Sequence, residues 1–306
     1  MKYTKRWQKQ AVRGLVFWGL KGIALISRLF PWQWGVRFGG YLGRASFHLL
    51  SKERRTAQAN IEMALGNERS PDELNRILRC NFENLGKGLI EILNMSGLRR
   101  EELEELVELE GEEHLKRAYA EGKGVILITG HIGNWELMGA FLAHRGYPLH
   151  VIAAPLYDPR IDEWINRSRA LFDIQTISRG TPSSSRKILT VLRRAEILGL
   201  LIDQDTRVEG VFVDFFNRKA YTPSGAASLA LRSGAATMTC FIVRLPGNRH
   251  RISIQKPISL ISTGDHQKDL VLNTALFTRS IEDYVRHYPE QWVWMHRRWK
   301  TEEASS

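Results

Sequence analysis

Residues 125–136 read VILITGHIGNWE and join a short apolar strand to the start of a helix. Val125–Thr129 is typical of a strand covered on both faces. Gly130 and Gly133 permit a tight turn after it, because glycine tolerates backbone angles that other residues avoid. A strand that passes directly into a helix indicates an α/β unit, and such folds place functional residues at the carboxyl ends of their strands.

Strands and helices alternate outward from this segment over most of the chain. An α/β fold with a largely parallel central sheet flanked by helices is therefore predicted. Upstream, a Ser70 cap with Glu73 three residues on marks the start of a helix over 71–95. The remaining predicted strands are 107–110, 149–153, 174–177, 198–202, 237–245 and 251–260, and the remaining predicted helices are 52–65, 136–144, 162–172, 185–195, 223–233 and 265–287.

The positive charge of the chain is concentrated at its amino-terminal end. The 306 residues carry a formal charge of +11, and the first 52 hold ten Lys and Arg with no Asp or Glu. Within them lies an apolar run over 14–30, interrupted by Lys21 and Arg28 and flanked by tryptophans. This pattern favours a helix lying in or obliquely across an anionic membrane interface.

Two other interpretations of this run stay open. The first is a helix that spans the membrane. Its seventeen residues are fewer than the roughly 20 that a spanning helix needs, yet Lys21 can extend its ammonium to the interface. An ordinary buried helix with a basic outer face is the second. We divide the chain into a membrane-anchoring segment, residues 1–50, and a larger domain, residues 51–306.

Composition excludes several classes of protein. Hydrophobic residues make up 43% of the chain, too many for a disordered protein. Cys80 and Cys240 are the two cysteines, so neither a disulfide framework nor a cysteine-rich zinc site is expected. No secretory cleavage site and no nucleic-acid-reading motif is apparent. A non-enzymatic basic binding module remains the alternative to an enzyme.

His131 and Glu136 are the first candidates for chemistry. Chance predicts about one His-to-acid pair at this spacing in the chain, and two occur, because His48 and Glu53 form a second. The spacing alone is therefore weak evidence. The strand and the glycines around His131 are what distinguish this pair. Five residues apart on one helix, the two side chains would diverge by about 140°. They meet only if His131 lies on the turn and Glu136 in the first helical turn. A carboxylate beside an imidazole is typical of a general base.

The segment Gly-His-x-Gly-Asn-Trp-Glu resembles the H-x4-D/E signature of the lipid A late (secondary) acyltransferases, within the lysophospholipid acyltransferase superfamily. In that family Asn often precedes the histidine, where this chain has Gly130. Further segments resemble the family in the same order: Arg54-Arg55 with Asn60-Ile61, then 158–169, 203–216, 222–225 and 288–300.

The resemblance implies an acyltransferase-like fold with a membrane-associated amino-terminal helix. It also implies transfer of a fatty acyl group from acyl carrier protein or acyl-CoA to a hydroxyl of a lipid A precursor, at the cytoplasmic side of the inner membrane. Neither a metal nor a cofactor is expected. Another glycolipid or a lysophospholipid is the alternative acceptor.

The resemblance also assigns roles to residues. His131 is expected to act as general base, with Glu136 orienting its imidazole, and Arg167 and Asp203 are expected to be catalytic. The residues predicted to support substrate binding are Asn134, Arg169, Gln204, Asp205, Arg207 and Arg218.

Overall fold

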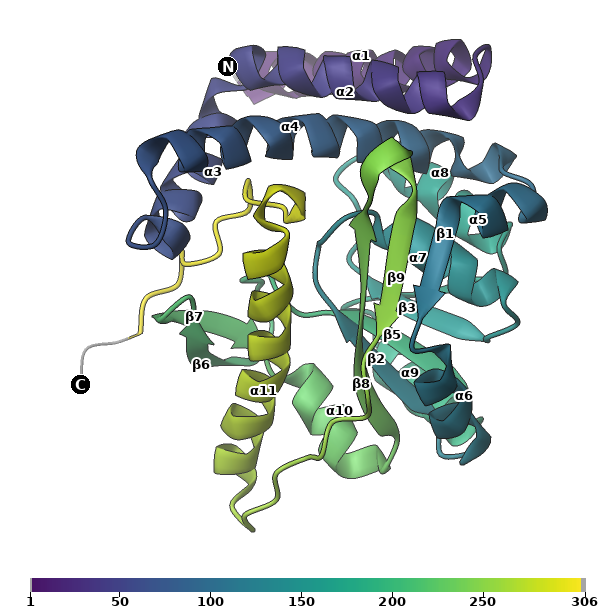
Figure 1. The fold of residues 1–306 in the computed structure, drawn as a ribbon, viewed down its shortest axis with the longest axis vertical. Coiled ribbons are helices and arrows are strands. Elements are labelled where there is room, and N and C mark those ends of the chain that lie inside the picture. Colours follow the sequence, from purple (N-terminus) through teal and green to yellow (C-terminus); the bar gives the residue numbers. More distant parts are fainter. Residues whose placement is uncertain (1, 304–306) are drawn as a thin grey trace.

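A seven-stranded sheet forms the centre of the computed structural model, which describes residues 2–303, with side chains from residue 12 onward (Figure 1). Its strand order is β1-β9-β8-β2-β5-β3-β4. The five strands from β8 to β4 run parallel to one another, whereas β9 is antiparallel to β8 and carries β1 parallel to itself. The predicted α/β fold with a largely parallel sheet is confirmed. The strands are β1 (Val107–Glu110), β2 (Val125–Thr129), β3 (Leu149–Ala153), β4 (Gln175–Ser178), β5 (Ile197–Leu201), β8 (Ala236–Arg244) and β9 (His250–Ile254).

Helices cover both faces of this sheet. On one face lie α5, α6 and α7, and on the other α9, α10 and α11. Leu127 of β2 belongs to the apolar cluster of the first face and Ile128 to that of the second, so the strand is apolar throughout. The helices are α1 (Lys2–Arg28), α2 (Trp32–Leu49), α3 (Ser51–Leu65), α4 (Pro71–Asn94), α5 (Arg100–Leu106), α6 (Glu112–Ala120), α7 (Trp135–His144), α8 (Pro159–Ala170), α9 (Ser184–Arg193), α10 (Gly225–Ser233) and α11 (His266–His287).

Several predicted elements have different bounds in the structure, and two of these differences have a clear physical reason. The strand predicted over 251–260 ends at Ile254, three residues before Pro257, which has no amide to donate to a sheet. The helix predicted from residue 223 begins at Gly225, because strand β7 (Arg218–Pro223) first completes an antiparallel hairpin with β6 (Gly210–Phe215).

The amino-terminal helices form a separate layer on the outside of the fold. Figure 1 shows α1 and α2 side by side, with α4 running beneath them toward the sheet. Glycines bring α2 and α4 into backbone contact: a Cβ at Gly43 would lie 2.2 Å from the Phe82 carbonyl oxygen, and one at Gly86 would lie 2.2 Å from that of Gly39. Any side chain at these positions would separate the two helices. Among residues 2–303, no helix is both long and apolar enough to cross a bilayer.

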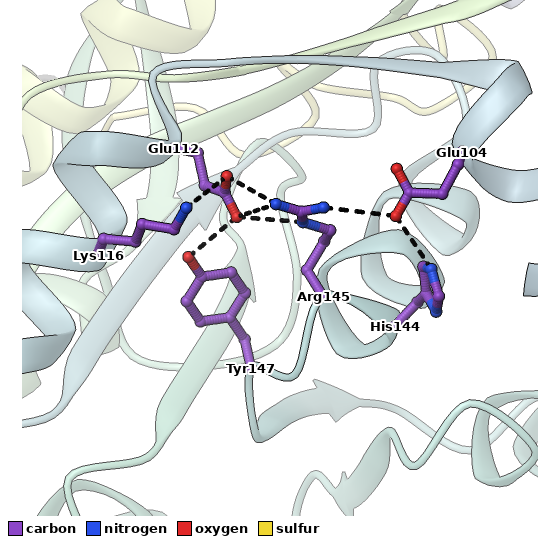
Figure 2. A network of polar contacts seen from close by, with 6 residues as sticks. All are labelled: Glu104, Glu112, Lys116, His144, Arg145 and Tyr147. Atoms are coloured by element: carbon purple, nitrogen blue, oxygen red, sulfur yellow. Dashed lines mark hydrogen bonds and ion pairs between the residues drawn. The ribbon is translucent and has the colours of Figure 1, made fainter.

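The glutamate-rich segment before β2 has a structural role (Figure 2). Glu112 of α6 accepts hydrogen bonds from Arg145 and Tyr147, and Glu104 of α5 pairs with Arg145 and His144. These contacts bind α5 and α6 to the carboxyl end of α7 and so brace the helix that begins at the predicted site.

Candidate active site

The sheet register brings His131 and Asp203 together. β2 and β5 are parallel neighbours, with Thr129 paired to Leu201. His131 and Asp203 each lie two residues beyond the end of their strand. Both side chains therefore leave the sheet at the same edge, the edge where α/β folds place their sites.

Two glycines make this turn possible. A Cβ at position 130 would lie 3.1 Å from Asp203 Oδ2, tighter than most real contacts. Gly133 has φ +59°, and a Cβ there would lie 2.3 Å from the Ile242 carbonyl oxygen. A larger residue at position 130 would therefore crowd Asp203 in this backbone.

Asp203 holds the imidazole of His131 in one orientation. The His131 Nδ1 lies 2.7 Å from Asp203 Oδ1, and the backbone amide of His131 donates to Asp203 Oδ2 at 2.7 Å. The indole of Trp292 donates to the same Oδ2 at 2.7 Å. Burial opposes ionisation of Asp203, but His131 and these donors lower its pKa to about 2. An ionised Asp203 accepts a hydrogen bond from Nδ1–H and keeps the proton on that nitrogen, which leaves Nε2 of His131 free to act as a base.

Trp292 reaches Asp203 because side chains of α3 and α4 hold the carboxyl-terminal segment in place. Asn60 Nδ2 donates to the Trp294 carbonyl at 2.7 Å, and Asn81 Nδ2 donates to the Trp292 carbonyl at 2.6 Å. The sequence marked residues 288–300 as family-like but gave no role to Trp292. The Trp-x-Trp pattern there, two large buried side chains after a Pro, was the available signal.

Glu136 has a different partner from the one predicted. Among the described side chains, the carboxylate bonded to the His131 imidazole is that of Asp203, which corrects the expected His131–Glu136 pair. Both carboxylate oxygens of Glu136 accept hydrogen bonds from Arg169, at 2.8 Å from Nε and 2.5 Å from Nη2. Burial opposes the charge of Arg169, yet Glu136 raises its pKa above the ordinary value. The pair joins α7 to α8.

Of the two arginines on α8, Arg169 rather than Arg167 lies at the cavity. Arg167, predicted to be catalytic, is 76% exposed and pairs with Glu163 on its own helix. Arg169, predicted only to support binding, is 13% exposed and lines the cavity described below. The two positions lie about 200° apart around a helix, so only one of them faces the site.

The other predicted binding residues divide into three groups. Gln204 lines the cavity. Asp205 is buried and anchors the chain end, since its Oδ2 accepts from the Thr301 amide at 2.9 Å. Arg207 and Arg218 are both exposed; Arg218 donates to the Met63 carbonyl at 3.2 Å. Neither arginine is part of the cavity wall.

Asn134 fixes the start of α7 and links it to a buried charge cluster. Its Oδ1 accepts from the Leu137 amide at 3.1 Å, and its Nδ2 donates to Glu91 of α4 at 3.0 Å. Glu91 is fully buried and also binds Arg244 at 2.8 Å and His250 at 3.1 Å. Burial opposes ionisation of Glu91, but Arg244 and His250 hold its pKa well below the ordinary range. α4, β8 and β9 thus position the loop that bears His131.

A deep cavity of ≈ 380 Å³ opens beside His131. Its polar part comprises Thr129, His131, Glu136, Asp162, Arg169, Arg179, Gln204 and Thr206. Its remaining wall is mostly apolar and comes from α7, the sheet strands β2, β3 and β5, and the start of β4. These apolar lining residues include Leu127, Met138, Gly139, Leu142, Leu149, Val151, Ile174 and Gly199. A polar site that continues into an apolar cavity suits a ligand with one reactive end and a hydrocarbon chain.

Within residues 2–303, no group of three or more His, Cys, Asp or Glu side chains is placed to hold a metal ion.

Comparison with known proteins agrees with this geometry. Residues 3–301 match the model of the family described as bacterial lipid A biosynthesis acyltransferase. The chain is 26% identical over 291 residues to the lipid A biosynthesis palmitoleoyltransferase of Escherichia coli K12, covering 94% of this chain and 91% of that one. It is 25% identical over 289 residues to the lauroyltransferase of the same organism, with 94% and 92% covered.

A third relative acts on another lipid. The phosphatidylinositol mannoside acyltransferase of Mycobacterium tuberculosis CDC 1551 is 27% identical over 172 residues, which cover 55% of this chain and 54% of that one. The match over nearly the whole chain is to the lipid A enzymes. This chain is therefore an acyltransferase that belongs to the bacterial lipid A biosynthesis acyltransferase family.

Proposed function

We propose that the protein transfers a fatty acyl chain from an acyl thioester to a hydroxyl of a lipid A precursor, with His131 as general base. The observation that carries this proposal is the His131–Asp203 pair at the polar end of an apolar cavity. The names of the two Escherichia coli relatives support the choice of acceptor.

The proposed reaction begins with proton transfer. Nε2 of His131 takes the proton of the acceptor hydroxyl, and the oxygen attacks the thioester carbonyl. Asp203 keeps the proton on Nδ1 and stabilises the imidazolium, the role that the sequence had given to Glu136. Collapse of the tetrahedral intermediate breaks the C–S bond, and His131 returns its proton to the thiolate.

The oxyanion of this intermediate needs hydrogen-bond donors. The amides of Trp135 and Glu136 lie in the first turn of α7, where amides have no partner within the helix. The positive end of the helix dipole favours negative charge at the same place. We assign the oxyanion to these amides and regard the Glu136–Arg169 ion pair as positioning α7 against α8.

The deep cavity is proposed to hold the donor acyl chain, delivered by acyl carrier protein or by coenzyme A. The thioester already carries the activated acyl group, so the proposed steps use the His131 and Asp203 side chains together with the backbone amides of α7. Gly199 lies four residues before Asp203, about 13 Å along the strand. A Cβ at Gly199 would be in ordinary contact with Val151 and Leu149, which line the same cavity.

Filling this part of the cavity should shorten the preferred acyl chain. Gly199→Ala adds one methyl group and Gly199→Val three carbon atoms, so the preference should shift stepwise toward shorter chains. Each methylene excluded removes about 0.8 kcal/mol of burial for the longer substrate. Competition among thioesters of different length, read by mass spectrometry of the product, measures the shift. An unchanged length profile in an active Gly199→Val enzyme would contradict this assignment of the cavity.

We further propose that the α1–α2 layer rests on the cytoplasmic face of the inner membrane. Large apolar side chains are exposed on it, among them Leu15 at 77%, Trp18 at 68% and Leu25 at 67%. Apolar side chains gathered with many basic residues are typical of a surface that binds an anionic bilayer. Arg28, although exposed, is bound to the end of α4, where it donates to Asn94 Oδ1 and the Leu93 carbonyl at 3.2 Å.

Replacing two exposed apolar residues of α1 should weaken membrane binding. The double variant Trp18→Glu, Leu25→Glu is expected to bind vesicles of anionic lipid at least about tenfold more weakly, since each change removes an apolar anchor and adds repulsion. Sedimentation with vesicles at low and high salt is the measurement. Val271→Glu, at a 38% exposed position of α11, is the matched control. Wild-type binding by the double variant would place the membrane contact elsewhere.

The proposed function is tested by mass spectrometry of the products. Purified enzyme is given an acyl carrier protein thioester or acyl-CoA, and a lipid A precursor in competition with a phosphatidylinositol mannoside and a lysophospholipid. The expected product is the lipid A precursor heavier by one acyl group. Preferred acylation of either competitor would replace the acceptor, and thioester-independent binding alone would favour a non-enzymatic module.

A further inference from the structure

We infer that a second cavity, beside α4, holds an acyl chain of the acceptor lipid while the donor chain occupies the deep cavity. This inference rests on the proposed function. The second cavity is a groove of ≈ 190 Å³. Its volume lies below the range of about 300–1,000 Å³ usual for whole small-molecule ligands, which suits one segment of a lipid chain.

One face of α4 forms the long wall of the groove. Leu85, Gly88, Leu89 and Ile92 line it, at the three- and four-residue spacing that places side chains on one side of a helix. Trp135, the first residue of α7, lines the groove as well. Leu89 is 38% exposed, so the groove is open to ligands from outside.

The groove meets the cavity beside His131 at two shared side chains. Trp135 and Ile92 line both cavities. The Trp135 ring lies 4.7 Å from the His131 ring, centroid to centroid, in an edge-to-face arrangement. An acyl transfer between two lipids needs two chains to approach one base from different directions. The deep cavity and the groove provide two such approaches on the two sides of Trp135.

The state of the polar groups in the groove favours a hydrocarbon ligand over a sugar or a phosphate. Arg244 lines the groove, but Glu91 holds its guanidinium with two hydrogen bonds. Gln291 is likewise engaged, since its side chain accepts from the Arg244 amide at 2.6 Å and donates to the Arg244 carbonyl at 3.0 Å. Asn81 and Asn84 also line the groove, and the Nδ2 of each donates to the Glu290 carbonyl at 3.2 Å. Asn81 Oδ1 has no hydrogen-bond partner among the described residues but is buried. With these donors occupied, the groove offers a ligand mainly its apolar wall.

The position of the groove indicates the acceptor rather than the donor. α4 lies between the α1–α2 layer, proposed to face the membrane, and the sheet (Figure 1). A lipid that keeps part of itself in the bilayer reaches His131 past this helix. The donor thioester arrives instead on a soluble carrier and has the deeper cavity for its chain.

Gly88 allows the groove to be filled without disturbing its surroundings. A Cβ at this position would meet no atom within 4 Å. Leucine is also a better helix former than glycine, so the helix itself is not weakened. Gly88→Leu is expected to raise the acceptor KM about tenfold, the effect of displacing roughly two buried methylene groups. The donor KM is expected to stay within about twofold.

The matched control is Gly97→Leu, at an exposed glycine that also has open space around it and lines neither cavity. It should keep wild-type KM values for both substrates. An unchanged acceptor KM in Gly88→Leu, or an equal rise in the donor KM, would overturn the assignment of the groove. If the wild-type enzyme transfers no acyl group to a lipid A precursor, the proposed function itself fails, so the two failures are distinguishable.

Chemical protection gives an independent readout. In a Cys80→Ala background, where the remaining native cysteine, Cys240, is buried, Leu89→Cys places a thiol at the groove for reaction with a maleimide. A lipid A precursor in detergent micelles is expected to slow labelling several-fold relative to empty micelles, whereas an acyl-CoA is not. Labelling that is slowed only by acyl-CoA, or by neither, would contradict the inference.

Discussion

The His131→Ala and Asp203→Asn variants are each expected to lose about 10²- to 10⁴-fold in kcat, the usual contribution of a positioned general base. Removing the imidazole leaves no group to take the acceptor proton. The effect of Asp203→Asn is less direct and follows from the way the carboxylate is shared. Oδ2 accepts from the His131 amide and the Trp292 indole, whereas Oδ1 faces Nδ1 of the imidazole.

An asparagine at position 203 has only one oxygen, and two N–H donors hold it at the Oδ2 position. The new amide group therefore faces Nδ1 and donates to it. The proton of the neutral imidazole must move to Nε2, the atom that should act as base. Steady-state transfer rates measure the loss, and thermal unfolding checks that both variants fold. Arg167→Gln is the control, because Arg167 is 76% exposed and its partner Glu163 62%. An Asp203→Asn enzyme of near-normal rate would show that Asp203 does not set the tautomer.

The Glu91→Ala variant is expected to lose about 3–5 kcal/mol of unfolding free energy, the usual effect of removing one partner from a buried ion pair. Glu91 is 0% exposed and Arg244 has 7% of its side chain exposed, so the change leaves a buried cation unpaired. Asn134 also loses its partner on α4, and the His131 loop should become less ordered. Chemical denaturation measures the stability, and kcat reports on the loop.

A double variant separates these two roles. Glu91→Leu with Arg244→Met replaces the ion pair by apolar groups of similar size, which should restore most of the stability. It does not restore the hydrogen bond to Asn134, so kcat is expected to stay low. Full recovery of kcat in the double variant would show that the cluster serves stability alone.

Because the pKa of Glu91 is depressed in the folded protein, its contribution to the free energy of unfolding is present above the ordinary glutamate range near pH 4 and falls as the pH drops below it.

The fold could be predicted from local patterns, because strands such as Val125–Thr129 and the helices between them have clear periodicities. The N-terminal layer could not be placed in the same way. Glycines 39, 43 and 86 show no pattern that names their partner helix, since close approach depends on which two backbones meet. The end of β9 was misjudged because the apolar pattern continues beyond Pro257.

In the site, too, the local sequence identified residues but not which of them meet in the folded chain. His131 and Asp203 were both recognised as residues that follow strands, but their contact depends on β2 and β5 being neighbours in the sheet. Strand order results from the packing of the whole chain, so neither segment predicts it by itself. Glu136 was the nearest acid in sequence and therefore the natural prediction. The orientation of α8, which brings Arg169 rather than Arg167 to Glu136, likewise follows from tertiary packing.

If the α1–α2 layer rests on the membrane as proposed, the backbone contact between α2 and α4 determines the distance between the reaction site and the lipid surface. Packed helices usually have axes about 8–10 Å apart, and helices that meet through glycines approach more closely than others. In the proposed orientation, α2 rests on the bilayer, α4 lies directly on α2, and Glu91 of α4 ties down the loop of His131. The glycine pairs therefore minimise the distance that an acceptor hydroxyl must rise from the membrane plane to reach its base.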